Sequence, residues 1–357
     1  MSLALALGRR GLGNVWPNPA VGCLIVRDGR VLGRGWTQPG GRPHAETEAL
    51  AAAGAAARGA TAYVSLEPCA HHGQTPPCAD ALVAAGVARV VVAAPDPDPR
   101  VAGAGLARLR AAGVEVTEDV CRQQAEALNA GFLKRQTAGR PLLTLKLATS
   151  LDGRIATAAG ESQWITSAAA RARAHLLRAQ HDAVLIGSGT ALADDPMLTC
   201  RLPGWTGPQP VRLVFDARLR LPADGALARS ADRIPLWVLT APGQDSPALS
   251  ATGAELVAVP AGPSGGIDLA AAMDELGRRG LTRVLVEGGA GLASALLRAG
   301  LVDRLAWFRA SCLIGDDGLA AIDGLGVAQL ADRHNFHRVR VEAVGDDLLE
   351  SYLPRTL

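Results

Sequence analysis

The sequence predicts an α/β fold divided into two domains. Short runs rich in valine, leucine and isoleucine alternate with alanine-rich runs along the 357 residues, and such alternation is typical of α/β proteins. The length fits two domains at about 150 residues each. The alternation breaks at Gly139-Arg140-Pro141 and then restarts. We therefore expect domains at residues 1–139 and 140–357.

In the first domain, we expect strands wherever short apolar runs end in glycine, proline or a polar turn. A short helix and a turn should occupy residues 1–20. The expected strands are 21–26, 61–66, 89–94 and 114–116. The expected helices are 44–58, 78–83, 104–112 and 121–138.

The second domain repeats the alternation. The expected strands are 142–148, 183–186, 211–216, 235–239, 283–286 and a weak one at 256–259. One helix should run from 167 to 180, with Ser167 or Thr166 as its N-cap, since a side-chain oxygen there satisfies free amides. Another helix should end near residue 299. Residues 241–266 are rich in Pro, Gly, Ser and Ala, so we expect surface loops there.

A histidine, a glutamate and two cysteines indicate a zinc site. His44 and the thiolates of Cys69 and Cys78 offer zinc three ligands and leave a fourth position for water. Glu46, two residues after His44, is free to move protons. H-x-E followed by Pro-Cys and a second Cys is the signature of zinc nucleobase deaminases, but here eight residues rather than two separate the cysteines.

The order of these residues matters more than their types. An isolated cysteine or histidine is more often a buried or surface group than a ligand. Here His44 opens a helix, Cys69 follows a strand and Cys78 opens the next helix. Because α/β folds direct groups at strand ends and helix starts to one place, the zinc interpretation is favoured.

Composition excludes several classes of function. The net charge is only +2 and aromatic residues make up 3%, which argues against a basic or base-stacking surface for nucleic acid. No apolar stretch approaches the ~18 residues that a membrane span needs. The six cysteines are scattered, which disfavours structural disulfides. We therefore expect a cytoplasmic protein that binds neither nucleic acid nor membrane.

Three further segments are candidates for ligand contacts. Asn18, between two prolines, is either part of a turn or a hydrogen-bonding partner for a heterocycle. The loop 95–99, which three prolines make rigid, follows a strand and suits substrate contacts. The glycine turn 287–291 either binds a phosphate at a helix start or simply permits the turn. The G-x-G-x-x-G dinucleotide fingerprint is absent, so any nicotinamide cofactor must be held by another fold.

Specific motifs resemble those of the bifunctional riboflavin-biosynthesis deaminase–reductases, and the resemblance covers nearly the whole chain. The deaminase-like segments are Pro-Asn-Pro-x-Val-Gly (17–22), Pro-His-Ala-Glu (43–46), Leu-Glu-Pro-Cys-x-His-His-Gly-x-Thr-Pro-Pro-Cys (66–78) and Gly-Phe-Leu-Lys-Arg (131–135). The reductase-like segments are Leu-Lys-Leu-x-x-Ser-Leu-Asp-Gly-Arg (145–154), Gly-Glu-Ser-Gln-Trp-Ile-Thr (160–166), Leu-Ala-Asp-Asp-Pro-x-Leu-Thr (192–199) and Val-Glu-Gly-Gly (286–289). The long loop between the cysteines is particular to this family.

The resemblance implies a cytidine-deaminase-like α/β/α N-terminal domain and a dihydrofolate-reductase-like α/β C-terminal domain. It implies one zinc ion per chain and NADPH as cofactors, and a small phosphoribosyl pyrimidine as substrate. The N-terminal domain would remove the 2-amino group of 2,5-diamino-6-ribosylamino-4(3H)-pyrimidinone 5′-phosphate. The C-terminal domain would then reduce the ribosyl chain of the aminouracil to ribityl.

For the deaminase half, the resemblance assigns a role to each matching residue. Those roles are: catalysis by Glu46; zinc binding by His44, Cys69 and Cys78; substrate binding by Asn18, His72 and Asp96. The chain departs from relatives at two positions. Trp16 stands where they often carry histidine, and Gln74 where they often carry a basic residue facing the substrate phosphate.

For the reductase half, the matching residues fall into two groups. The cofactor group is Ala148, Trp164, Thr190, Asp194, Gly289, Ala290, Gly291, Leu292, Ala293, Ser294 and Ala295. The substrate group is Lys146, Ser162, Arg178, Asp194, Leu198, Arg201 and Glu287. Arg171 and Arg173 are expected on a solvated helix face. The proton donor stays open among Asp194, Lys146 and Glu287.

Other hypotheses were weighed against a bifunctional enzyme. One half could be inactive, or the chain could be a binding protein for pyrimidine nucleotides, but a binder needs neither a metal nor a base. A tRNA deaminase is disfavoured by the weak positive charge and the long cysteine loop. We expect a homo-oligomer, most simply a dimer.

Overall fold

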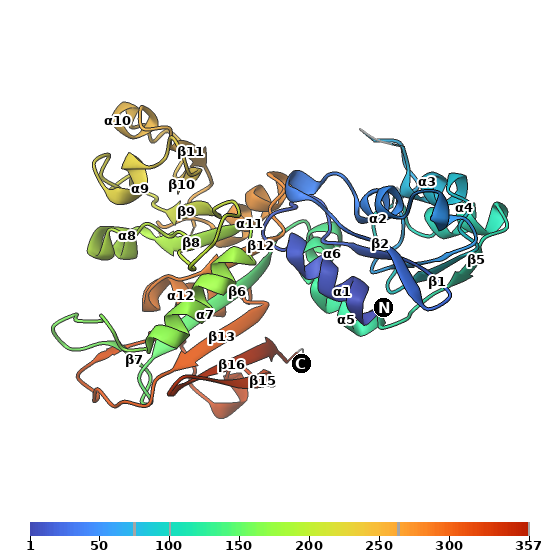
Figure 1. Ribbon diagram of the computed structural model, residues 1–357. Helices are drawn as coiled ribbons and strands as arrows, with labels where there is room; N and C mark the ends of the chain where they lie inside the picture. Colours follow the sequence, from blue (N-terminus) through green and yellow to red (C-terminus); the bar gives the residue numbers. More distant parts are fainter. Residues whose placement is uncertain (74–75, 100, 263–264, 356–357) are drawn as a thin grey trace. The chain divides into compact units, whose positions relative to one another are not determined.

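Two β-sheets organise the chain, one in each of two units, Met1–Gly139 and Arg140–Leu357 (Figure 1). The computed structural model describes residues 1–73, 76–99, 101–262 and 265–355. Gln74, a position noted above, lies outside these ranges.

The N-terminal unit is built around a five-stranded sheet in the order β2-β1-β3-β4-β5. Its strands are β1 Gly22–Arg27, β2 Arg30–Trp36, β3 Thr61–Val64, β4 Arg89–Val92 and β5 Glu115–Thr117. Its α-helices are α1 Ser2–Gly8, α2 Ala45–Ala53, α3 Cys78–Ala84, α4 Ala104–Ala111, α5 Arg122–Leu128 and α6 Ala130–Ala138. β1 is antiparallel to β2 and β3, whereas β3, β4 and β5 are parallel.

Alternating side chains of β1 explain why helices cover both faces of this sheet. Cys23 and Ile25 are fully buried in one cluster with Ala49 of α2, while Leu24 belongs to another with Leu7 of α1. Successive residues of a strand point to opposite faces, so each apolar face requires a cover. The α/β/α arrangement follows.

The parallel strands determine where functional loops can gather. Cys69 and Asp96 lie in the loops that follow β3 and β4, two neighbouring parallel strands. The carboxyl ends of parallel strands form one edge of a sheet, where α/β proteins bind their ligands.

The C-terminal unit contains a nine-stranded sheet in the order β11-β10-β9-β8-β12-β6-β13-β16-β15 and a small sheet of β7 and β14. Its strands are β6 Leu142–Thr149, β7 Arg154–Ala156, β8 Ala183–Gly187, β9 Val211–Phe215, β10 Leu236–Thr240, β11 Glu255–Ala258, β12 Arg283–Val286, β13 Arg304–Arg309, β14 Leu319–Ala320, β15 Phe336–Val344 and β16 Asp347–Pro354. Its α-helices are α7 Ala168–Ala179, α8 Ser188–Asp194, α9 Ala226–Arg229, α10 Pro247–Ser250, α11 Leu269–Arg278 and α12 Ala290–Arg298.

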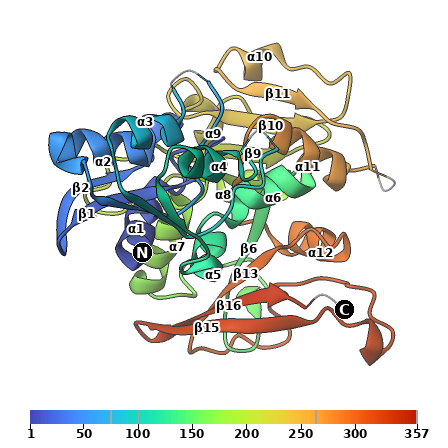
Figure 2. The same cartoon turned by 90° about the vertical axis from the view of Figure 1, so that its right-hand side faces the viewer.

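From β11 to β13 all pairings are parallel, and the antiparallel hairpin β15–β16 forms the other edge of the sheet (Figure 2).

A buried carboxylate joins two of the central strands at their start. Asp182 accepts hydrogen bonds from the amides of Thr282 and Arg283 at 2.6 and 2.8 Å. At their carboxyl ends, β8 ends at Gly187 and β12 leads into Glu287.

Most expected elements are present, with ends within two residues of those expected, and the expected α/β class is confirmed. The helix expected at 44–58 is shorter, because α2 ends at Ala53 before Gly54, which has a positive φ, and a 3-10 helix follows at Gly54–Ala57. Ser167 is the N-cap of α7, and its hydroxyl accepts from the Ala170 amide. The helix expected at 121–138 is two helices. Asn129 breaks it: its side chain is buried and its carboxamide oxygen accepts from the Ala20 amide.

The weak strand expected among the loops of residues 241–266 is present as β11, but the short helix α10 in the same region was not expected. The other strands and α-helices that were not expected are β2, β7, β13, β14, β15, β16, α8, α9 and α11. Among the described residues, no helix combines the length and the apolar character that crossing a membrane would need.

Two glycines of β2 allow α2 to approach the sheet closely. A Cβ on Gly33 would lie 2.0 Å from the Ala49 carbonyl oxygen, and one on Gly35 would lie 2.1 Å from the Ala45 carbonyl oxygen. Since α2 carries Glu46 and begins after His44, this contact positions the zinc site.

We expect Gly35→Ala to lower the free energy of unfolding by about 1–3 kcal/mol, the usual cost of overpacking, and to reduce zinc content. Denaturant unfolding and metal analysis measure the two effects. Gly266→Ala is the control, because a Cβ there meets no atom within 4 Å. Equal stability of both variants would contradict the prediction.

Candidate active sites

Three ligand atoms meet at one point in the N-terminal unit. The Nδ1 atom of His44 lies 3.3 Å from the Cys78 sulfur and 3.7 Å from the Cys69 sulfur, and all three atoms lie within 4.8 Å of one another. Two local features arrange them. His44 is the N-cap of α2 and Cys78 is the first residue of α3, while the Cys78 amide donates to the Cys69 sulfur at 3.3 Å.

This donor set fits zinc. Bonds of about 2.3 Å to sulfur and about 2.0 Å to nitrogen at tetrahedral angles imply a nitrogen–sulfur separation of about 3.5 Å, between the two observed distances. The hydrogen bond with Cys78 lowers the pKa of the Cys69 thiol to about 4, so a thiolate is available as a ligand.

Glu46 lies beside the three ligands and is almost completely buried. Burial raises the pKa of its carboxyl to about 7, although the nearby His44 opposes the rise. A carboxyl with a pKa near neutrality is suited to taking up and releasing protons. The zinc ligands and the acid–base group predicted from sequence are therefore brought together.

A cavity of about 300 Å³ opens at these residues. Asn18, His44, Glu46, Cys69 and Asp96 line it. The Asn18 side chain also donates to the Gly41 carbonyl oxygen at 2.8 Å, so Asn18 both stabilises its turn and faces the cavity. Burial raises the pKa of Asp96 to about 6.

One residue predicted to bind the deaminase substrate does not line this cavity. Among the described residues, His72 is exposed and outside the cavity wall, whereas its neighbour His71 lines it. The Nδ1 atom of His71 is buried and has no hydrogen-bond partner within the described chain. Sequence alone could not choose between two adjacent histidines. Trp16 is also absent from the lining.

Glu67 is a residue of this site that the sequence reasoning missed. Its buried carboxylate accepts hydrogen bonds from the amides of Gly103 and Gly105, both at 3.1 Å, and from those of Asp96 and Leu106 at 3.4 and 3.5 Å. It therefore holds the loop that carries Asp96. A glutamate directly before Pro-Cys was the available signal, but its partners are backbone amides about 30 to 40 residues away, which spacing does not reveal.

The C-terminal unit contains a much larger open cavity, of about 2000 Å³, at the carboxyl ends of β6, β8, β9 and β12. Every residue predicted for the reductase half lines it except Ala293 and Ser294. These two lie on the buried side of α12, where the Ser294 hydroxyl accepts from the Asp323 amide. Position in a motif could not distinguish the two faces of this helix.

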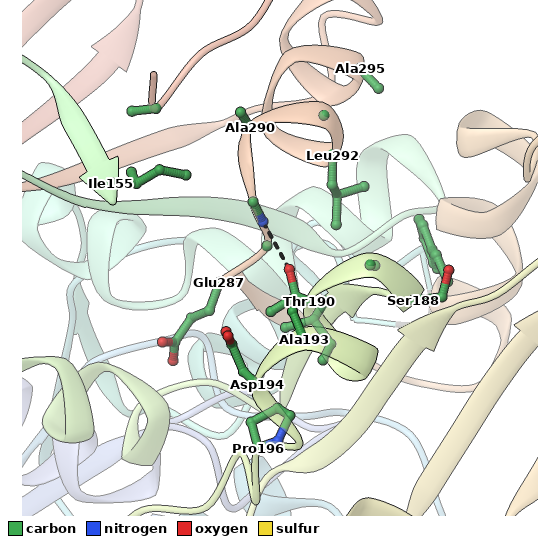
Figure 3. A pocket seen from close by; sticks show the side chains of 18 of the residues that line it. Ile155, Ser188, Thr190, Ala193, Asp194, Pro196, Glu287, Ala290, Leu292 and Ala295 are labelled. Carbon is green, nitrogen blue, oxygen red and sulfur yellow. Dashed lines mark hydrogen bonds between the residues drawn. The ribbon is translucent and has the colours of Figure 1, made fainter. Parts of the chain in front are cut away.

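A glycine turn and the start of α12 form one wall of this cavity. Gly289 is the N-cap of α12, and its amide donates to the Thr190 hydroxyl at 3.1 Å (Figure 3). A Cβ on Gly291 would meet no atom within 4 Å, so space for a ligand exists beside the helix start. Backbone amides at such a start favour phosphate groups, which fits the diphosphate of a nicotinamide cofactor.

Charged residues surround the buried carboxylate of Glu287 on the facing side. Arg178 donates two hydrogen bonds to it, at 2.6 and 3.1 Å, and the Lys146 ammonium lies 3.6 Å away. Burial alone would raise the pKa of Glu287, but Arg178 and Lys146 lower it to about 2. Burial raises the pKa of Asp194, whose side chain also borders the cavity (Figure 3).

One expectation about the arginines of α7 was wrong. Arg171 is half-buried, lines the cavity and lies over the ring of Trp164 at 4.5 Å from its centroid. A planar guanidinium stacks readily on an aromatic face. Trp164 precedes α7, so the helical periodicity of α7 does not indicate this contact. Arg173 pairs with Glu342.

Comparison with known proteins agrees with both sites. Residues 1–94 match the cytidine and deoxycytidylate deaminase zinc-binding region, and residues 141–349 match the RibD C-terminal domain. The chain is 46% identical to riboflavin biosynthesis protein RibD of Escherichia coli K12 over 370 residues, covering 98% of this chain and 96% of that one. It is 39% identical to that of Bacillus amyloliquefaciens, covering 99% and 95%.

Solved structures show the same similarity over the whole chain. Acinetobacter baumannii RibD, form 1, superposes with a TM-score of 0.91 at 39% identity, covering 99% of this chain and 98% of that one. A diaminohydroxyphosphoribosylaminopyrimidine deaminase/5-amino-6-(5-phosphoribosylamino)uracil reductase from Thermotoga maritima superposes with 0.87 at 34% identity, covering 99% and 97%.

Fold and sites together define a zinc-dependent deaminase of the cytidine-deaminase type joined to an NADPH-dependent reductase. The chain belongs to the riboflavin biosynthesis protein RibD family. It is therefore a bifunctional enzyme of riboflavin biosynthesis.

The charge pairs of Glu287 predict a pH-dependent stability. The pKa is about 2 in the folded chain and 4.5 ordinarily, so ionisation of Glu287 stabilises the fold above about pH 4.5, and this contribution is lost as the pH falls towards 2. Glu287→Gln should lower the free energy of unfolding by about 3 kcal/mol at pH 7 and by roughly half of that at pH 3.

Urea unfolding at the two pH values, followed by fluorescence, measures this difference. Glu255→Gln, at an exposed glutamate of the same unit, is the control and should have little effect at either pH. A loss of stability that is equal at pH 3 and pH 7 would contradict the charge-pair explanation.

Proposed function

We propose that residues 1–139 carry the deaminase activity and residues 140–357 the reductase activity, acting in that order on one phosphoribosyl pyrimidine. The deaminase would hydrolyse the 2-amino group of 2,5-diamino-6-ribosylamino-4(3H)-pyrimidinone 5′-phosphate. The reductase would then convert the ribosyl chain of 5-amino-6-(5-phosphoribosylamino)uracil to ribityl. The observation that carries the proposal is the meeting of His44, Cys69 and Cys78 beside the buried Glu46.

In the first reaction, His44, Cys69 and Cys78 would hold zinc, a Lewis acid that makes water nucleophilic at neutral pH. Glu46 would accept a proton from the attacking water and deliver protons to the ring and to the departing ammonia. Its pKa of about 7 supports both directions of transfer.

The heterocycle would be oriented by groups on the cavity wall. Asn18 and Asp96 are suited to hydrogen-bond the polar edge of the pyrimidine, and His71 takes the role that the sequence assigned to His72. Glu67 acts indirectly, because it holds the loop of Asp96. Positioning of this kind lowers the entropic part of the barrier.

In the second reaction, NADPH supplies the hydride. Trp164, Thr190 and the turn Gly289–Gly291 would hold the cofactor, while Arg178 and Arg201 would hold the substrate. Glu287 is poorly suited to donate a proton, since its pKa is about 2 and two cations pair with it. The donor is then Lys146 or Asp194.

We also propose that the enzyme is a cytoplasmic homodimer. The outermost strand of the large sheet, β15, supports this, because Val339 and Val341 are half-exposed on it and an uncovered edge strand favours pairing with another chain. Light scattering measures the mass of the particle in solution, and a monomeric mass would refute the dimer.

The function is tested by supplying the diaminopyrimidine phosphate with NADPH and following ammonia release and NADPH oxidation separately. Glu46→Gln should reduce ammonia release by at least ~10²-fold, the usual contribution of a positioned proton carrier. Its oxidation of NADPH with the deaminated substrate should equal that of the unchanged enzyme. Retained deamination would refute the role of Glu46.

Removal of zinc provides a second test of the deaminase assignment. Metal analysis should give about one zinc per chain, and a chelator should abolish ammonia release while NADPH oxidation with the deaminated substrate persists. A metal-free chain with full deaminase turnover would contradict the zinc site. If the unchanged enzyme never oxidises NADPH, the reductase assignment is wrong.

A further inference from the structure

Arg42 is a charged residue in the wall of the deaminase cavity to which neither the motifs nor the zinc chemistry gives a role. It lines the cavity together with His44, Glu46 and Asp96. It lies two residues before the zinc ligand His44, in the segment that leads from β2 into α2.

Arg42 and the zinc ligand His44 both line the cavity, on either side of Pro43 in the chain. Both Arg42 and His44 have extended conformations, with φ and ψ of −150° and 150° for Arg42 and −73° and 159° for His44. The exposure agrees: Pro43 is exposed, whereas Arg42 and His44 are half-buried.

The loop between the two cysteines lies against the same guanidinium. A Cβ placed on Gly73 would be 3.2 Å from the Nη2 atom of Arg42. The guanidinium therefore lies between the segment that leads into α2 and Gly73 of this loop.

Carboxyl groups outnumber arginines on the cavity wall, which makes the guanidinium of Arg42 unusual there. Four carboxyl groups line the cavity, Glu46, Glu67, Asp96 and Asp98. Among the described lining residues, the arginines are Arg42 and Arg135. A wall with this charge would repel a doubly charged phosphate unless a cation compensates for it locally.

We propose that Arg42 binds the 5′-phosphate of the deaminase substrate and makes deamination selective for the phosphorylated form. The inference rests on the proposed function, in which the pyrimidine ring lies against Glu46. The ribosyl group separates the phosphate from the ring by several bonds, so the phosphate must bind away from the metal ligands but within the same cavity. The guanidinium of Arg42, on the wall of this cavity, is suited to form two hydrogen bonds with phosphate oxygens.

The test compares ammonia release from the diaminopyrimidine phosphate and from its dephosphorylated riboside, using the full zinc-loaded chain. Arg42→Gln should lower kcat/KM for the phosphate about 10- to 100-fold, the range for a charge-assisted hydrogen bond, mainly through KM. The kcat/KM for the riboside should change less than about twofold. Inhibition by ribose 5-phosphate should weaken by about tenfold or more.

Matched variants separate this role from a structural one. Arg34→Gln removes an exposed arginine of β2 and should change neither substrate's kcat/KM, while Arg42→Lys should retain part of the selectivity. Zinc content and NADPH oxidation with the deaminated substrate should stay unchanged in Arg42→Gln.

Three outcomes would overturn the proposal: equal losses on phosphate and riboside, no loss on either, or loss of selectivity in Arg135→Gln but not in Arg42→Gln. If the unchanged enzyme releases ammonia from neither compound, the proposed function itself fails, which is a different result.

Discussion

The N-terminal unit depends on the convergence of one imidazole and two sulfur atoms at the starts of two helices. His44 precedes α2 and Cys78 begins α3, so helix packing determines the geometry of the zinc ligands. The glycines of β2 allow α2 to lie close to the sheet. Any change that displaces α2 would also displace Glu46, because the ligand and the acid–base group belong to the same turn of chain.

Buried carboxylates in this enzyme have different roles because they have different partners. Glu67 accepts hydrogen bonds from backbone amides and holds a loop. Glu287 pairs with Arg178 and Lys146, which keep it ionised. Glu46 lacks comparable compensation, and burial raises its pKa to about 7. A buried carboxyl exchanges protons near neutral pH only when its charge is incompletely stabilised, and of these three glutamates only Glu46 meets that condition.

The sequence predicted those features that follow from local patterns. Apolar periodicity located nearly all central strands, and the motif order identified the zinc ligands. Contacts between distant segments were not predictable: the hydrogen bonds of Glu67 and the side-chain interaction that divides α5 from α6 at Asn129. The stacking of Arg171 on Trp164 was not predictable either, because Trp164 lies in the irregular segment before α7. The hairpin β15–β16 was also missed, because its outer strand is exposed at most positions and lacks a buried alternation.

Both cavities must bind a phosphorylated substrate, but the charged residues that line them are arranged differently. Each is lined by residues of one unit, so the phosphorylated intermediate must be recognised twice. In the C-terminal unit, Glu287 is paired with Arg178, and Arg201 adds a further cation. In the N-terminal unit, the carboxyl groups near the metal ligands are needed for proton transfer and orientation, so cations cannot surround them without suppressing the pKa of Glu46. In the proposed role, Arg42 supplies a cation for the phosphate on this cavity wall, while the pKa of Glu46 stays raised to about 7.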